Sequence, residues 1–188
     1  MKYEILTNQY IHYQERKLYR IRSLIKFEYM LGGFSHSVNI GEVGGFIQSE
    51  SNLPQEDYSW VSDNAKIFDN AIVSGYSRVY GNAKIYGNAL VKSGFIYGDC
   101  QIYENAEVVG STVYDYACVY GNAKLSSSCF ISGNCKIFGD AILSGRGVYV
   151  HDNSMIFGSS IIGNSSLNIH IYGNNIIDSK NIIYSPSL

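Results

Sequence analysis

The chain lacks the residue mixture of a helical protein. Gly, Asn, Ser, Tyr, Ile and Val, which favour strands and tight turns, dominate its 188 residues. It also lacks a strong charge of either sign, because 14 Lys and Arg residues face 16 Asp and Glu residues, for a formal net charge of −2. This balance excludes a strongly basic nucleic-acid binder and an acidic nucleic-acid mimic. Nucleic acid is therefore not an expected partner.

No long apolar run opens the sequence, since Met1-Lys2-Tyr3-Glu4 leads into polar, tyrosine-bearing sequence. We therefore expect neither a signal peptide nor a membrane span, and we predict a cytoplasmic location. The chain has four cysteines, Cys100, Cys118, Cys129 and Cys135, and their spacing does not match that of metal ligands. The repeat described next places three of them in small inward positions, as apolar fillers in a reducing compartment. No metal and no cofactor is expected.

What the chain does have is a six-residue repeat. The hexad Val79-Tyr80-Gly81-Asn82-Ala83-Lys84 is followed directly by Ile85-Tyr86-Gly87-Asn88-Ala89-Leu90, and variants run from Val61 nearly to the C-terminus. An aliphatic residue opens each hexad, and a small residue follows four places later. A period this short, sustained for this long, predicts a solenoid rather than a closed globule.

Irregular spacings reveal the larger unit. The hexads shorten by one residue between positions 91 and 96 and between 108 and 113, and lengthen by one between 143 and 150. Each change follows a third hexad, so the unit is a coil of three hexads, with length variation confined to one corner. The coils start at Val61, Val79, Ile96, Val113, Ile131 and Val150, with a weaker seventh from Ile171.

This pattern predicts a triangular parallel β-helix over residues 58–188. The opening aliphatics point inward and stack on their equivalents at about 4.8 Å per coil. Gly and Asn at the third and fourth positions turn the corners, because they tolerate positive φ. The small residue that follows each corner also points inward, and Thr112 is expected in this position four residues after Val108.

Residues 1–57 do not follow the repeat and are predicted to form a small β cap over the first coil, with Trp60 at its mouth. The alternation in Tyr19-Arg20-Ile21-Arg22 predicts a strand with one wet face. Its expected partners are Ile11 to Tyr13 and Leu24 to Tyr29. The stretch from Arg16 to Lys26 carries five basic residues and no acid, which leaves a basic patch and a solvated hairpin face both open.

The three-hexad coils resemble the left-handed β-helix of the hexapeptide-repeat acyltransferases. A closer resemblance is to the YdcK-like family of bacterial and phage proteins with Tyr-Asp-Asn-Ala repeats, and it covers most of the chain. It is carried by the Tyr-Gly-Asn-Ala hexads and by Gly44-Gly45-Phe46-Ile47, Asn52-Leu53, Gln55-Glu56 and Ser59-Trp60-Val61-Ser62-Asp63-Asn64-Ala65. The resemblance implies an all-β, left-handed parallel β-helix of about six to seven coils, in a family with no agreed activity.

The residue after each inward aliphatic points outward and defines a candidate binding surface. On the second side of the helix it is aromatic in every coil: Phe68, Tyr86, Tyr103, Tyr120, Phe138 and Phe157. On the first side it is aromatic in three coils: Tyr80, Tyr97 and Tyr114. Such rows mark interaction sites, or they form a structural ladder that stiffens the solenoid without any partner. Both interpretations stay open, and neighbouring lysines are too sparse to track a phosphate chain.

An enzyme is the alternative. The resemblance to acyltransferases implies a histidine at a turn, and the candidates are His151 on the first side and His170 in a loose stretch before the last coil. No long loop leaves any coil to build a substrate pocket, so a surface histidine is the favoured interpretation for both. The sequence thus argues against catalysis.

The C-terminal end of the solenoid lacks a covering helix and is apolar. This predicts a homo-oligomer paired through Ile176, Ile177, Ile182, Ile183 and Tyr184. The main functional hypothesis is a non-catalytic binding or scaffold protein with a protein partner. The resemblance to phage proteins implies an inhibitor of a host or defence protein.

Overall fold

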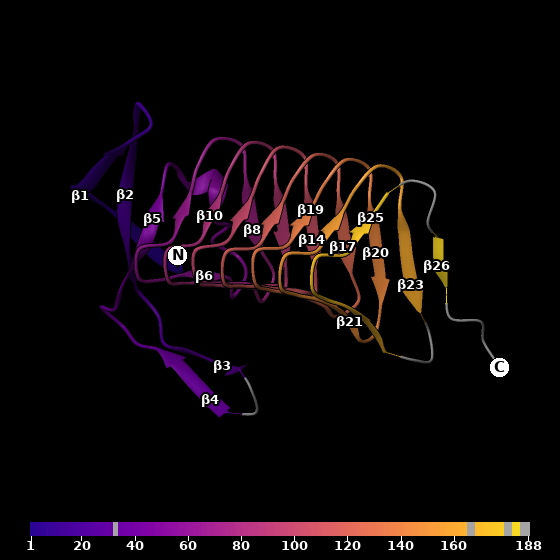
Figure 1. Cartoon of the computed structure of the whole chain (residues 1–188). Coiled ribbons are helices and arrows are strands. Elements are labelled where there is room, and N and C mark those ends of the chain that lie inside the picture. The colour runs from indigo at the N-terminus through magenta and orange to yellow at the C-terminus, as the bar shows by residue number, and fades with distance from the viewer. Residues whose placement is uncertain (32–33, 165–167, 179–181, 185–188) are drawn as a thin grey trace.

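The computed structural model describes residues 1–31, 34–164, 168–178 and 182–184. These residues form an all-β solenoid of seven coils, with a β cap at its N-terminal end (Figure 1). The one helical element among them is the short 3₁₀ turn η1 (Glu50–Asn52). No helix in this part of the chain has the length and apolar character needed to cross a membrane.

Each coil contributes one strand to each of three parallel sheets. Side one contains β6 (Trp60–Val61), β9 (Arg78–Val79), β12 (Phe95–Ile96), β15 (Thr112–Val113), β18 (Cys129–Ile131), β21 (Val148–Val150) and β24 (Ile169–Ile171). Side two contains β7 (Lys66–Ile67), β10 (Lys84–Ile85), β13 (Gln101–Ile102), β16 (Cys118–Val119), β19 (Lys136–Ile137), β22 (Met155–Ile156) and β25 (Ile176–Ile177). Side three contains β8 (Ile72–Ser74), β11 (Leu90–Lys92), β14 (Glu107–Val109), β17 (Lys124–Ser126), β20 (Ile142–Gly145), β23 (Ile161–Asn164) and β26 (Ile182–Tyr184).

The register of these sheets confirms the predicted β-helix. Ile85 pairs with Ile102 and Ile102 with Val119, and all three side chains are fully buried. Every predicted coil start also pairs with the next, ending with Val150 opposite Ile171. The aliphatic columns therefore form one continuous core along the axis of the solenoid.

Glycines and asparagines turn the corners as predicted. Gly98 has a φ of +78°, and a Cβ built on it would lie 2.9 Å from the backbone N of Asp115 on the next coil. Asparagines at the second corner form a hydrogen-bonded ladder in which each Nδ2 donates to the next Oδ1. This ladder runs through Asn70, Asn88, Asn105, Asn122 and Asp140 at 2.8–3.0 Å.

The inward assignment of Thr112 is wrong. Ser111 is the buried residue, 1% exposed, and Thr112 points outward between Phe95 and Phe130. Strand alternation fixes the inward residue two places before the next aliphatic, so a corner shortened by one residue moves this position. Of the cysteines, Cys100, Cys129 and Cys135 are buried as fillers, and Cys118 is half-buried.

The cap continues side two. Strands β1 (Tyr3–Tyr13), β2 (Arg16–Ser23) and β5 (Val43–Ile47) are antiparallel, and β5 then pairs in parallel with β7. The expected pairing of Leu24 to Tyr29 with the 19–22 strand is wrong, because β5 takes that edge. β5 can lie against coil one because Gly44 has no side chain: a Cβ there would sit 2.6 Å from the carbonyl oxygen of Val61.

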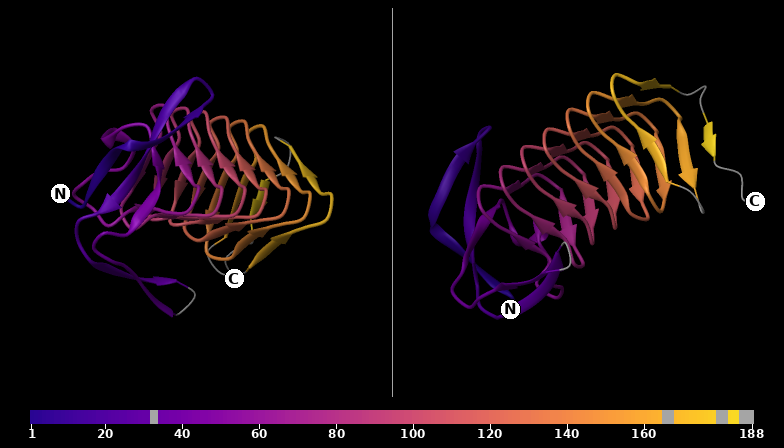
Figure 2. Two further views of the ribbon diagram at one scale, coloured as in Figure 1. Left: turned by 90° about the vertical axis from the view of Figure 1, so that its left-hand side faces the viewer. Right: turned by 60° about the horizontal axis from the view of Figure 1, so that its bottom comes forward.

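Strands β3 (Phe27–Leu31) and β4 (Phe34–Val38) form a separate antiparallel hairpin. It leaves the cap on the same side of the molecule as β6 and β21, beside side one (Figures 1 and 2). Its base covers Trp60, which is 2% exposed and meets the ring of Phe27 at 5.9 Å between centroids. The cap and hairpin together therefore close the first coil.

An ion pair within the cap is tied to the first coil, because Oδ2 of Asp57 accepts a hydrogen bond from the backbone N of Gly75 at 2.5 Å. Lys2 is 1% exposed, and its Nζ donates to Oδ1 of Asp57 at 2.9 Å and to Oγ of Ser59 at 3.1 Å. Burial lowers the pKa of Lys2. Burial alone would raise the pKa of Asp57, but hydrogen bonds from Ser59 and Lys2 hold it below its usual value. The ionised carboxylate of Asp57 therefore holds both Lys2 and Ser59 in place.

The basic stretch of the cap is largely paired. Arg16 binds Asp69, Arg22 lies 2.6 Å from the carboxylate of Glu4, and Lys26 lies 3.2 Å from that of Glu28. These pairs suit the face of a solvated hairpin, because each places an acid beside a base in contact with water.

Candidate binding surface

The aromatic row on side two is a closed ladder. Phe68, Tyr86, Tyr103, Tyr120, Phe138 and Phe157 stack with neighbouring centroids 4.8–5.0 Å apart and ring planes within 11° of parallel. Both faces of each inner ring are therefore covered by the ring above and the ring below. A partner on this side would meet ring edges and hydroxyl groups, which favours a stabilising role for this ladder.

The cap closes the N-terminal end of that ladder. The ring of Tyr13 meets Phe68 edge-on at 5.6 Å, and the guanidinium of Arg16 lies over Phe68 at 5.4 Å from the centroid. Nε of Arg16 also donates to Oδ1 of Asp69, the residue that follows this ring. A ring face at the end of a ladder is thus covered by an arginine.

Side one carries two outward columns. The first follows the inward aliphatics: Tyr80, Tyr97 and Tyr114 stack at 4.8–4.9 Å, then Ser132 interrupts, and His151 stacks on Tyr172 at 5.6 Å. Burial raises the pKa of Tyr80 to about 12. The second column precedes the aliphatics: Phe95, then Thr112, then Phe130, Tyr149 and His170, the last three stacked at 4.6–5.0 Å.

The second column was not predicted, because the prediction of outward residues covered only the residue after each inward aliphatic. The signal was present in the sequence. Strand alternation turns both neighbours of an inward residue outward, and Phe95, Phe130 and Tyr149 directly precede Ile96, Ile131 and Val150.

In each column one coil carries a small side chain, Ser132 or Thr112, where its neighbours carry aromatic rings. A cavity, called a gap below, opens at each of these two missing rungs. The Ser132 gap, of about 330 Å³, is lined by Tyr114, Asp115, Phe130, Ser132, Gly133, Tyr149, Val150, His151 and Asp152. The Thr112 gap, of about 420 Å³, is lined by Met30, Ser93, Phe95, Tyr97, Gly110, Thr112, Tyr114, Ser128 and Phe130. The two gaps lie in neighbouring columns and share Tyr114 and Phe130 in their walls.

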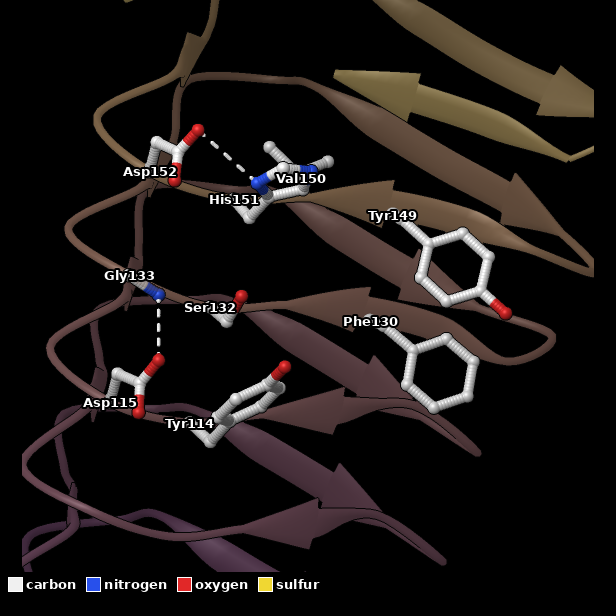
Figure 3. A pocket seen from close by; sticks show the side chains of 9 residues that line it. All are labelled: Tyr114, Asp115, Phe130, Ser132, Gly133, Tyr149, Val150, His151 and Asp152. Atoms are coloured by element: carbon white, nitrogen blue, oxygen red, sulfur yellow. Dashed lines mark hydrogen bonds and ion pairs between the residues drawn. The ribbon is translucent and has the colours of Figure 1, made fainter. Parts of the chain in front are cut away.

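The Ser132 gap has two ring walls and an acidic edge. Figure 3 shows Tyr114 on one side of Ser132 and His151 on the other, with Asp115 and Asp152 along the corner. Ser132 is only 9% exposed and lines the cavity between the two rings. The backbone N–H of Gly173 and the imidazole of His151 lower the pKa of Asp152, which holds this carboxyl in its ionised form.

The Thr112 gap is apolar by contrast. None of its lining residues carries a charge. Met30, on the hairpin and 61% exposed, lines this cavity together with Phe95 and Phe130. This gap is therefore suited to a flat, uncharged group.

Nearer the cap, the hairpin itself covers side one. Tyr29 and His36 stack at 5.4 Å, and the guanidinium of Arg78 lies over Tyr29 at 4.1 Å. Arg78 is 2% exposed, and burial lowers its pKa to about 10. A cavity of about 240 Å³ remains beneath the hairpin beside Tyr80. The hairpin thus packs an aromatic side chain of its own, Tyr29, against side one.

The candidate catalytic histidines both lie on side one. His151 has its Nδ1 3.3 Å from a carboxylate oxygen of Asp152. The placement of His170 in a loose stretch is wrong: it lies in β24, because its neighbours Ile169 and Ile171 pair with the previous coil. Within the described ranges, no group of three or more His, Cys, Asp or Glu residues could hold a metal ion.

The predicted oligomer end is only partly visible. Ile176 is 65% exposed and Ile177 is buried, while strand β26 pairs with β23. The side chains of Ile182, Ile183 and Tyr184 lie outside the described residues. Strands β24, β25 and β26 are the last in their sheets among the described residues.

No protein-family model matches the chain, and no curated protein sequence matches it significantly.

Proposed function

We propose that the chain is a non-catalytic, protein-binding scaffold that recognises its partner through side one. The observation that carries this proposal is the pair of missing rungs at Ser132 and Thr112. Ring faces are open to a ligand there, whereas the ladder on side two offers edges alone. Open aromatic faces in a groove are typical of the anchor sites at protein interfaces.

Rigidity supports a binding role. The coils are joined by parallel strand pairing on all three sides, and the corner asparagines are held by hydrogen bonds from coil to coil. A surface fixed in this way loses little conformational entropy when a partner binds, so more of the contact energy appears as affinity.

The charges beside the groove favour a protein over a nucleic acid. Asp63, Asp99, Asp115 and Asp152 occupy the corner that follows the first column. A row of carboxylates repels a phosphate backbone, which would need lysines and arginines in their place. A partner with basic and aromatic side chains suits this surface better.

The biological setting follows from the resemblance to YdcK-like bacterial and phage proteins of the hexapeptide-repeat type. It supports an inhibitor of a host or defence protein that acts in the cytoplasm. Unpaired thiols at all four cysteines accord with a reducing compartment.

A homo-oligomer is part of the proposal. The exposed side chain of Ile176 and the terminal edge of β25 support end-to-end pairing of two copies. Light scattering or native mass spectrometry should give a dimer or larger, and a strict monomer at micromolar concentration would contradict the pairing.

Binding through side one is tested by filling both gaps. The variant Thr112→Tyr/Ser132→Tyr should keep the far-UV circular dichroism of the wild type and lose a partner captured from the native host. The matched control is Ser126→Tyr, an outward position on side three. Equal capture by the filled and control variants would refute a role for side one.

An acyltransferase is the second candidate. The contact between His151 and Asp152 in an open cavity of about 330 Å³ favours it, because a carboxylate can orient an imidazole as a general base. Acetyl-CoA should then raise the melting temperature, and His151→Ala or His170→Ala should abolish the shift. An unchanged melting temperature in the wild type would eliminate this candidate.

A further inference from the structure

Arginine over an aromatic ring recurs in this chain. The guanidinium carbon lies 4.1 Å from the ring centroid of Phe46 for Arg20, and equally far from that of Tyr29 for Arg78. Arg16 over Phe68 is the most informative case, because the ring there ends a ladder and a carboxylate follows it in the sequence. Ring and acid together thus form a seat for a guanidinium.

The acid in that seat has a defined geometry. Asp69 adopts a φ of +58°, and its Oδ2 accepts a hydrogen bond from the backbone N of Gly87 on the next coil at 3.3 Å. This leaves Oδ1 for Nε of Arg16. The corner conformation therefore divides the two oxygens between the fold and the bound arginine.

The Ser132 gap carries the same ring-and-acid pair on both of its walls, and on the His151 wall this pair faces the gap as Phe68 and Asp69 face Arg16. Tyr114 is followed by Asp115 with a φ of +58°, and His151 by Asp152 with a φ of +64°. In each acid, Oδ2 accepts from a glycine N–H of the next coil, at 3.1 Å for Asp115 and 2.8 Å for Asp152. Oδ1 of both acids accepts no hydrogen bond from the described residues, and it corresponds to the atom of Asp69 that binds Arg16.

The width of the gap fits one planar group. Rings in the intact part of the column stack at 4.8–4.9 Å, so Tyr114 and His151 stand two steps apart, which is roughly 9.6 Å for strands spaced at about 4.8 Å. A planar cation in the middle would lie about 4.8 Å from each ring, which is within the limit of about 6 Å for a cation–π contact with Tyr114 and lets its plane stack on the imidazole of His151.

The aromatic rings and carboxylates that line the Ser132 gap favour a guanidinium over other planar or charged groups. It is flat and weakly hydrated on its faces, and its edge N–H groups donate hydrogen bonds to carboxylate oxygens such as those along this corner. A lysine ammonium is compact and strongly hydrated, so it neither fills a slot nor stacks as well. An anion would face Asp115 and Asp152 at short range.

We propose that the Ser132 gap is a binding site for the guanidinium of an arginine side chain presented by the partner protein. The identity of the occupant as a protein side chain rests on the proposed function. Recognition of the guanidinium itself is a property of this chain and can be measured without the partner.

The probe is the peptide acetyl-Gly-Arg-Gly-amide, titrated into the full chain at low ionic strength and followed by NMR shifts or calorimetry. The matched control peptide carries citrulline, which keeps the planar shape and loses the charge, and a lysine peptide keeps the charge and loses the plane. We expect the arginine peptide to bind at least about tenfold more tightly than either. Equal binding of the arginine and citrulline peptides would overturn the proposal.

Two variants locate the site. Ser132→Tyr adds the missing rung and should abolish binding, while the control Ser126→Tyr on side three should bind as the wild type does. The double variant Asp115→Asn/Asp152→Asn keeps an oxygen to accept the hydrogen bond from each glycine N–H, and it should weaken binding of the arginine peptide about tenfold. It tests the site even if Ser132→Tyr does not fold. Undiminished binding of the arginine peptide by either gap variant would overturn the assignment.

Peptide binding and partner capture together distinguish failure of the guanidinium site from failure of side one as the partner surface. Failure of the arginine peptide, combined with loss of partner capture in the gap-filled variant, would refute the guanidinium site and leave the binding surface standing. Binding of the peptide, combined with unchanged partner capture, would retain the guanidinium site and refute side one as the partner surface.

Discussion

The contact between Lys2 and Asp57 should control the stability of the cap. In Asp57→Asn the ammonium of Lys2, 1% exposed, keeps its burial and loses its counter-charge. Removing one partner of a buried ion pair costs about 3–5 kcal/mol. Since the Asp57 side chain is itself 22% exposed, we expect the lower end, about 3 kcal/mol, or about 6–12 °C in melting temperature for a chain of this length.

The assay is urea denaturation followed by the fluorescence of Trp60, the one tryptophan of the sequence, which follows Ser59 directly. The control is the double variant Lys2→Met/Asp57→Asn, which removes the uncompensated charge and should recover most of the lost stability. If Asp57→Asn unfolds within about 0.5 kcal/mol of the wild type, a size typical of neutral surface substitutions, the reasoning fails.

The same contact predicts a pH dependence. The folded pKa of Asp57 lies below its unfolded value, so its carboxylate contributes stability that is fully present above the unfolded pKa, about 3.9 for Asp. That stability is lost as the pH falls through the lowered folded pKa. The advantage of the wild type over Asp57→Asn should therefore begin to shrink below about pH 4 and keep shrinking as the pH falls, and an advantage that stays constant from about pH 6 to pH 2 would contradict the assignment.

Three further predictions concern the coils. Ile102→Ala removes a fully buried side chain from the axial column and should cost about 2–4 kcal/mol in urea denaturation. Gly98→Ala places a Cβ 2.9 Å from the backbone N of Asp115 at positive φ and should cost at least about 1–2 kcal/mol, whereas a neutral effect would mean that the corner relaxes. Cys118, half-buried, should react with a thiol reagent in the native state well before Cys100, whose pKa burial raises to about 12; Cys118→Ser should remove this fast phase.

The repeating part of the fold could be predicted from the sequence because each coil restates the same constraints. An aliphatic such as Ile85 must point inward, and its period fixes the partner, Ile102, without knowledge of any other contact. Stacking of Tyr86 on Tyr103 follows from that register.

The cap could not be predicted in the same way, because nothing in it repeats. The partner of β2 is chosen by the close approach of Gly44 to coil one, a tertiary contact that local alternation does not encode. The burial of Lys2 could not be predicted either, since its hydrogen-bond acceptor Asp57 lies 55 residues away in the sequence. The two gaps on side one could be recognised in the sequence at Ser132 and Thr112, but only when both outward columns are aligned.

The corner between sides three and one, where coil length varies, also borders the Thr112 gap through Ser93, Gly110 and Ser128. Residues can be gained or lost at this vertex while the aliphatic columns keep their alignment, as the shortened and lengthened coils of this chain already do. The contour of the groove and the stability of the coils are therefore set by separate parts of each repeat. Natural variation at this corner can reshape the groove with little penalty in folding.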